Sequence, residues 1–175
     1  MSEEQVPSSA VTLVEEGVRR NLELAATWLA WDGRPRVAED GERLYTPHKA
    51  IRRHADHLVD HLAQIEALLA GVPTEEDHWR ASSVTLASDL APFTEPDLNE
   101  ARQRLTRLAQ IYSIRLRSLP DEEWDASREP DWTIRQIVEH VAPPWYAEQV
   151  GDLRAEGAAS SAARHPKPPA HDDSQ

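Results

Sequence analysis

Three of the eight histidines lie within one short stretch of the sequence, at His54, His57 and His61. His57 and His61 are four residues apart, so on a helix their side chains lie one above the other on the same face. Two imidazoles in that arrangement can chelate one divalent cation, and a third ligand must then come from a distant part of the chain. His140 lies in the other segment with comparable helical character. The spacing therefore predicts a metal site formed by His57, His61 and His140, with His54 as an alternative to His57.

The ligand types indicate which chemistry such a site would support. Imidazole binds zinc, nickel, copper and iron, and we expect zinc or nickel here. Three protein ligands leave a coordination position open, which is typical of catalytic rather than structural sites. Water bound at an open position loses a proton near neutral pH and becomes a nucleophile or a base. A His-x-x-x-His pair also occurs on helices that bind no metal, so a non-catalytic helical module for binding or dimerisation stays as the alternative.

Composition narrows the remaining classes of function. The chain has 175 residues and no cysteine, so one domain is expected and thiolate sites, disulfides and cysteine nucleophiles are excluded. A net charge of −12 repels phosphate backbones, so we expect no nucleic-acid partner. The N-terminal residues lack the basic region and apolar core of a signal peptide, and no apolar run is long enough to span a bilayer. We therefore expect a cytoplasmic protein without membrane association.

Helical periodicity shows which elements must position the histidines. Four segments carry it, and almost none of the sequence alternates as a strand does. Thr46 and Pro47 predict the start of the histidine-rich helix, and Gly71 predicts its end. The other helices are expected at residues 11–31, 94–119 and 133–153. A polar loop is expected at residues 34–45 and an irregular stretch at residues 74–93, with a short helix or hairpin at residues 79–90.

The segment that carries His140 has the clearest start in the chain. Thr133 and Gln136 have the spacing of a capping box, around which Trp132 and Ile137 fit a hydrophobic staple. The consecutive prolines at residues 143–144 predict a break just after His140, with a second helical piece from about residue 145 to 153. By helical-wheel arithmetic His54 and His61 lie near the centre of the apolar stripe of their helix. His57 lies nearer the flank and His140 on the edge of its own stripe.

These elements favour an all-α fold, in which four amphipathic helices of this length form a four-helix bundle. We expect a flexible N-terminus over residues 1–10, the bundle over residues 11–155 and a disordered tail over residues 156–175. Both sets of histidines would then face the interior of the bundle from its rim.

Two motifs resemble the DinB-like family, which includes the mycothiol-dependent maleylpyruvate isomerases and related thiol transferases. Trp132-Thr133 followed by His140 is similar to the family's Trp-Ser/Thr helix start with a metal-binding histidine eight residues on. His57, His61 and the following Gln64-Ile65 are similar to its His-x-x-x-His motif. The order of the two motifs is reversed here, so the chain resembles a circular permutation of the family's bundle.

The resemblance implies a divalent metal held by His57, His61 and His140, and a low-molecular-weight thiol as a second cofactor. It implies a metal-dependent thiol transferase, isomerase or hydrolase that acts on a small molecule. The resemblance does not identify the substrate, because members of the family differ widely. Helical bundles often dimerise through their helix faces, so a homodimer is a separate expectation. A third interpretation gives the clustered histidines a pH-responsive structural role.

Overall fold

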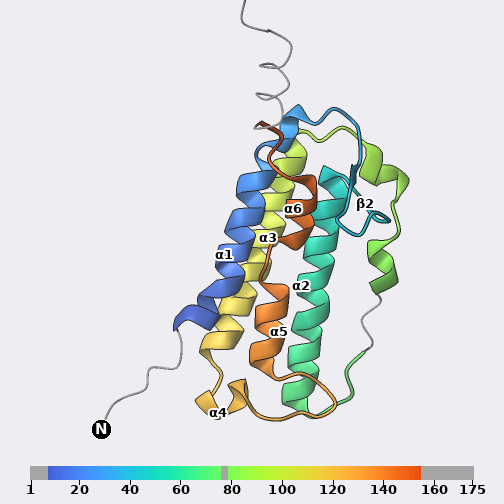
Figure 1. The fold of residues 1–175 in the computed structure, drawn as a ribbon. Coiled ribbons are helices and arrows are strands. Elements are labelled where there is room, and N and C mark those ends of the chain that lie inside the picture. Colours follow the sequence, from blue (N-terminus) through green and yellow to red (C-terminus); the bar gives the residue numbers. More distant parts are fainter. Residues whose placement is uncertain (1–7, 76–78, 155–175) are drawn as a thin grey trace, which may run out of the picture.

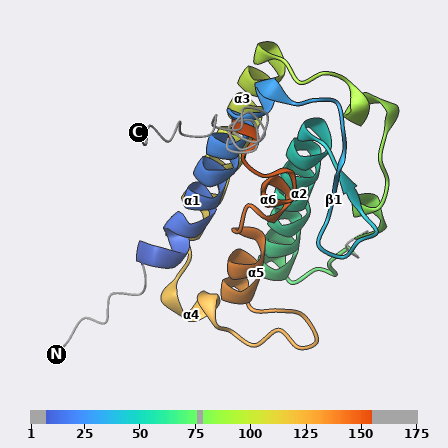
Figure 2. The same ribbon diagram turned by 45° about the horizontal axis from the view of Figure 1, so that its top comes forward.

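Long helices dominate the computed structural model, which describes residues 8–75 and 79–154. Figures 1 and 2 show α1 (Ser8–Ala25), α2 (Pro47–Ala70) and α3 (Glu95–Arg117) side by side, with α5 (Ile134–Val141) and α6 (Trp145–Val150) laid end to end along them. The predicted all-α class is confirmed. The predicted disordered tail lies outside the described residues, as does most of the predicted flexible N-terminus.

Short elements connect these helices. The turns η2 (Trp79–Ser82) and η3 (Ala87–Leu90) lie within the stretch predicted to hold short structure, and α4 (Asp121–Trp124) precedes α5. The segment predicted as a polar loop contains a small antiparallel hairpin of β1 (Arg36–Val37) and β2 (Leu44–Tyr45). Two-residue strands are too short for an alternating pattern to be visible in the sequence.

The ends of α2 follow the predicted signals. The Thr46 side chain accepts a hydrogen bond from the Lys49 backbone N–H at 3.2 Å, and Pro47 occupies the first turn, where its missing N–H has no helical partner. At the other end Gly71 has φ +67°, a left-handed conformation that glycine adopts without steric cost. These signals fix the helical register of the histidines between them.

The first helix differs from its prediction at both ends. It begins at Ser8 and ends at Ala25, after which the chain turns through η1 (Trp28–Ala30). Trp28 is fully buried, and its indole N–H donates to the Gly151 carbonyl at 2.9 Å. Periodicity continued through Trp28 because a buried turn shows the same apolar side chains as a helix.

The break between α5 and α6 is confirmed at the predicted place. Thr133 and Gln136 form the predicted capping box at the start of α5, and the helix ends at Val141, directly before the two prolines. Gly17 on α1 packs against this break so closely that a Cβ atom there would lie 1.7 Å from the Ala142 carbonyl oxygen. A glycine on α1 thus allows the backbone just after His140 to approach α1 closely.

Apolar side chains from every long helix form one core. The largest of the fully buried apolar and aromatic side chains include Trp28, Tyr45, Tyr112, Leu58, Ile65, Leu105, Leu116, Ile134 and Ile137. Within the described ranges, no helix combines the length and the apolar character that a membrane crossing requires.

Candidate metal centre

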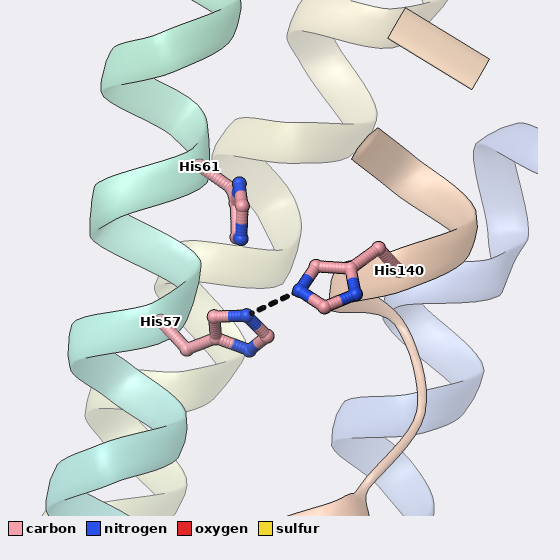
Figure 3. Close-up of side chains that lie close together, drawn as sticks. All are labelled: His57, His61 and His140. Atoms are coloured by element: carbon pink, nitrogen blue, oxygen red, sulfur yellow. Dashed lines mark hydrogen bonds between the residues drawn. The ribbon is translucent and has the colours of Figure 1, made fainter. Parts of the chain in front are cut away.

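Three histidines meet where α2 and α5 lie side by side. His57 and His61 project from the same face of α2, and His140 projects toward them from α5 (Figure 3). Each offers a ring nitrogen, and these atoms all lie within 4.8 Å of one another. His57 Nε2 and His140 Nε2 are 3.1 Å apart and share a hydrogen bond. The structure therefore brings together the three residues predicted from spacing, which we call the histidine triad.

The spacing of the nitrogens suits a small divalent cation. Zinc binds imidazole nitrogen at about 2.0–2.1 Å, so two ligands of a tetrahedral zinc lie about 3.3 Å apart. The 3.1 Å between His57 Nε2 and His140 Nε2 is already close to that separation. The widest pair must approach by no more than about 1.5 Å, which rotation of the imidazole rings can supply. Three such ligands leave the fourth position open.

Gln64 fixes the orientation of one imidazole. Its Oε1 atom accepts a hydrogen bond from His61 Nδ1 at 2.8 Å. Because an amide oxygen can only accept, Nδ1 carries the proton, and in the neutral ring the lone pair is then on Nε2. Metal-binding histidines characteristically donate their other ring N–H to an oxygen in this way. His61 is therefore already in the tautomer that a cation at the triad needs.

Burial keeps the His57 ring of the triad in the state that binds metals. His57 is 7% exposed and His61 is 5% exposed, while His140 is partly buried. Burial lowers the pKa of His57 to about 2, helped by the nearby His61, His140, His54 and Arg53. A neutral imidazole is the metal-binding form, so protons do not compete at the His57 ring near neutral pH.

His54 lies outside the triad, although it is on the same helix. It is 1% exposed, and neither ring nitrogen makes a hydrogen bond within the described part of the chain. Burial lowers its pKa to about 4, so the ring is neutral at pH 7. The cluster of closely spaced ligand atoms contains His57 and not His54. The structure thus favours His57 between the two candidates that the sequence left open.

Contacts with α3 hold α2 at the level of the triad. The Tyr112 hydroxyl of α3 donates to the Leu58 carbonyl at 2.7 Å, and both side chains are fully buried. Leu58 lies between the two α2 histidines in the chain, so this bond fixes the turn that carries them. The apolar stripe faces α3 and the core, while α5 and α6 cover the adjacent flank. The helical-wheel arithmetic placed His57 on this flank. Because α5 and α6 cover the flank, His57 is nevertheless part of the site.

Aromatic side chains surround the triad. The Trp132 ring lies 4.9 Å from His140 and stacks on His61 at 6.4 Å between centroids. Trp132 is 44% exposed, so this residue, which the sequence assigned to a hydrophobic staple, covers the triad at the surface. Tyr146 is buried, with its ring 5.5 Å from that of His57.

Two features of the site were not predicted from the sequence. Gln64 was part of the motif, but no role followed from its type; its signal is the three-residue spacing from His61, which puts the two side chains on one helical face. Arg43 lines a pocket with His57 and His140 and comes from the hairpin. No local signal marks Arg43, because its position depends on how the hairpin packs on α6.

Comparisons with protein-family models, with curated proteins and with solved structures found no match to this chain.

Proposed function

We propose that this chain is a divalent-metal protein in which His57, His61 and His140 hold zinc or nickel. We further propose that the metal serves chemistry on a small molecule. The observation that carries the proposal is the convergence of three imidazole ring nitrogens from two helices within 4.8 Å. The hydrogen bond from His61 to Gln64 supports it, because it fixes the tautomer that a metal ligand needs.

The proposal includes membership of the DinB-like family, with the four-helix bundle in permuted order. Its support is that the two motifs which resemble the family lie on α2 and α5 and meet at one place. If α5 and α6 are taken together as one interrupted helix, then α1, α2, α3 and this interrupted helix correspond to the four helices of such a bundle (Figure 1). The order of the motifs along the chain does not affect which side chains meet, because a circular permutation preserves packing.

An open coordination position favours catalysis over a structural role. A divalent ion held by three imidazoles lowers the pKa of a bound water to near 7 and would likewise favour the thiolate of a small thiol. Within the described residues no carboxylate lines the pocket beside the triad, so no side-chain general base of that type is at hand. The proposed reaction is therefore transfer, isomerisation or hydrolysis by a metal-activated nucleophile, with a low-molecular-weight thiol as the second cofactor.

Zinc binding by the full chain, purified without a histidine tag, tests the metal centre. We expect about one zinc per chain by elemental analysis, and loss of that zinc in the triple variant His57→Ala, His61→Ala, His140→Ala. His48→Ala is the matched control, because His48 lies on α2 outside the triad and bonds the Pro92 carbonyl at 3.2 Å. Equal zinc content in the triple variant and the control would favour the non-catalytic module instead.

Cobalt substitution tests the thiol. Addition of cysteine to the cobalt-loaded protein is expected to produce a sulfur-to-cobalt charge-transfer band, since a thiolate takes the open position. If the protein binds cobalt through the triad but shows no such band, the metal centre stands and the thiol cofactor does not.

A further inference from the structure

A pocket of about 380 Å³ opens beside the histidine triad. That volume is in the range of small-molecule sites. The residues that line it are Arg43, His57, His140, Pro143, Trp145 and Tyr146. The pocket is thus lined by two of the proposed metal ligands, by aromatic and proline rings, and by one guanidinium group. Arg43 is the only lining residue with a charged side chain in the part of the chain that the structure describes.

Arg43 is held in place with hydrogen-bond donors to spare. The Asp40 carboxylate accepts from the Arg43 Nε–H and also from its backbone N–H at 3.0 Å. The guanidinium carbon lies 4.8 Å from the centre of the Trp145 ring, so the group stacks on a pocket wall. Among the described residues, no group accepts a hydrogen bond from the two terminal Nη atoms. These four N–H donors are therefore available to a ligand.

Cationic side chains gather near the pocket, although the chain as a whole is acidic. The chain carries −12 overall, yet two further cations lie near Tyr146, which lines the pocket, and near Tyr45, whose ring contacts that of Trp145. The Lys49 ammonium is fully buried, 4.9 Å from the Tyr45 ring, and the Arg53 guanidinium lies 5.8 Å from the Tyr146 ring. Cations close to a pocket of low polarity raise the electrostatic potential inside it. Arg53 is paired with the Asp56 carboxylate at 3.1 Å, and Arg43 is paired with Asp40. The attraction for an anion therefore rests on the spare Nη donors of Arg43, which lines the pocket.

We infer that this pocket binds a small carboxylate with an aromatic or other apolar body. The carboxylate oxygens would accept from the two Nη groups of Arg43, the bidentate geometry that a guanidinium offers. The body of the ligand would pack on Trp145 and Tyr146, and a second donor atom would face the open position at the triad. The inference rests on the proposed function, because it assigns the substrate class of that same metal centre.

Calorimetric titration of the zinc-loaded full chain with benzoate tests the inference. Benzamide, which has the same shape without the charge, and inorganic phosphate, an anion without the apolar body, are the comparison probes. We expect benzoate to bind more tightly than either, and Arg43→Gln to weaken benzoate binding at least tenfold. Arg36→Gln is the matched control, because Arg36 lies on β1 of the same hairpin, pairs in register with Tyr45 and does not line the pocket. The control is expected to bind benzoate as the wild type does.

The outcomes separate this inference from the metal centre, because the zinc content of each protein is measured before titration. Zinc-loaded protein that binds benzoate equally in Arg43→Gln and Arg36→Gln overturns the inference and leaves the metal centre standing. Tighter binding of phosphate than of benzoate overturns the carboxylate assignment. A wild-type chain that takes up neither zinc nor nickel overturns both proposals. Benzoate binding lost in Arg43→Gln alone, at full zinc content, supports the inference.

Discussion

Gln64 Oε1 lies 2.8 Å from His61 Nδ1 and accepts its proton, one helical turn beyond the residue that it orients. Both residues are on α2, so the bond does not depend on how the helices pack. It fixes the direction of the His61 lone pair before any other ligand arrives. The His57–His140 bond joins two different helices and depends on the approach of α5 to α2.

Loss of the Gln64 acceptor is expected to weaken zinc binding without removing it. Partners of this kind typically contribute 10- to 100-fold to metal affinity, so Gln64→Leu should raise the zinc dissociation constant by about that factor. Gln64→Glu keeps an oxygen acceptor at the same position and is expected to retain most of the affinity. Competition with a zinc chelator of known affinity measures both variants. Equal affinity in Gln64→Leu and wild type would mean that the bond has no role in metal binding.

Zinc is expected to stabilise the fold, because its ligands come from both α2 and α5. A ligand that binds only the folded state at 100 times its dissociation constant adds about 2.7 kcal/mol to the unfolding free energy. Urea denaturation with and without zinc should show an increase of that order in the wild type. In His140→Ala the increase should be much smaller, since the two ligands left both lie on α2. A similar increase in that variant would place the stabilising zinc elsewhere.

The sequence predicted those parts of the site that depend on one helix. The four-residue spacing of His57 and His61, the cap at Thr46 and the end at Gly71 are local, and all are present in the structure. The double proline likewise predicted the break that ends α5 after His140. Local rules suffice wherever backbone geometry alone decides which side chains share a face.

The sequence did not predict what depends on packing between elements. The helical-wheel arithmetic placed His57 at the flank because it assumed one apolar stripe on the helix. In the structure α2 packs against α3 on one side and against α5 and α6 on another. Arg43 reaches the pocket through a hairpin whose strands are two residues each, too short to leave a pattern. The hydrophobic staple assigned to Trp132 involves only its own helix, and it did not indicate that this ring, 44% exposed, lies over the histidines.

Gly17→Ala is expected to destabilise the protein and to disturb the position of His140. The added Cβ would lie 1.7 Å from the Ala142 carbonyl oxygen, so α1 and the α5–α6 break must move apart. Overpacking of this kind costs about 1–3 kcal/mol, more than the helix propensity that alanine adds. Urea denaturation measures the loss, and zinc affinity reports the displacement of His140.

Glu16→Ala provides the control for Gly17→Ala, because Glu16 is the exposed neighbour on the same helix. It should change the unfolding free energy by no more than about 0.5 kcal/mol. A Gly17→Ala variant as stable as this control would show that α1 and the break are not in close contact in solution.

His54 is expected to make the stability of the metal-free protein depend on pH between about 4 and 6.5. Burial lowers the pKa of its ring from 6.5 to about 4 in the folded state. Between these values the unfolded chain binds the proton and the folded chain does not, so acid favours unfolding. The stabilisation is complete above pH 6.5 and is lost as the pH falls toward 4. A shift of this size corresponds to about 3 kcal/mol.

His54→Leu isolates this effect, because leucine fills the buried position and binds no proton. At pH 7.5 the variant should be at least as stable as the wild type, since it removes two buried ring nitrogens that make no hydrogen bond within the described residues. As the pH falls from 6.5 to 4.5, the wild type should lose about 2–3 kcal/mol more than the variant. The lowered pKa of His57 makes the unfolding free energy decrease as the pH falls in both proteins. The difference between the two unfolding free energies therefore reports the contribution of His54. Parallel losses in urea denaturation at each pH would mean that the His54 ring reaches water or a partner in solution.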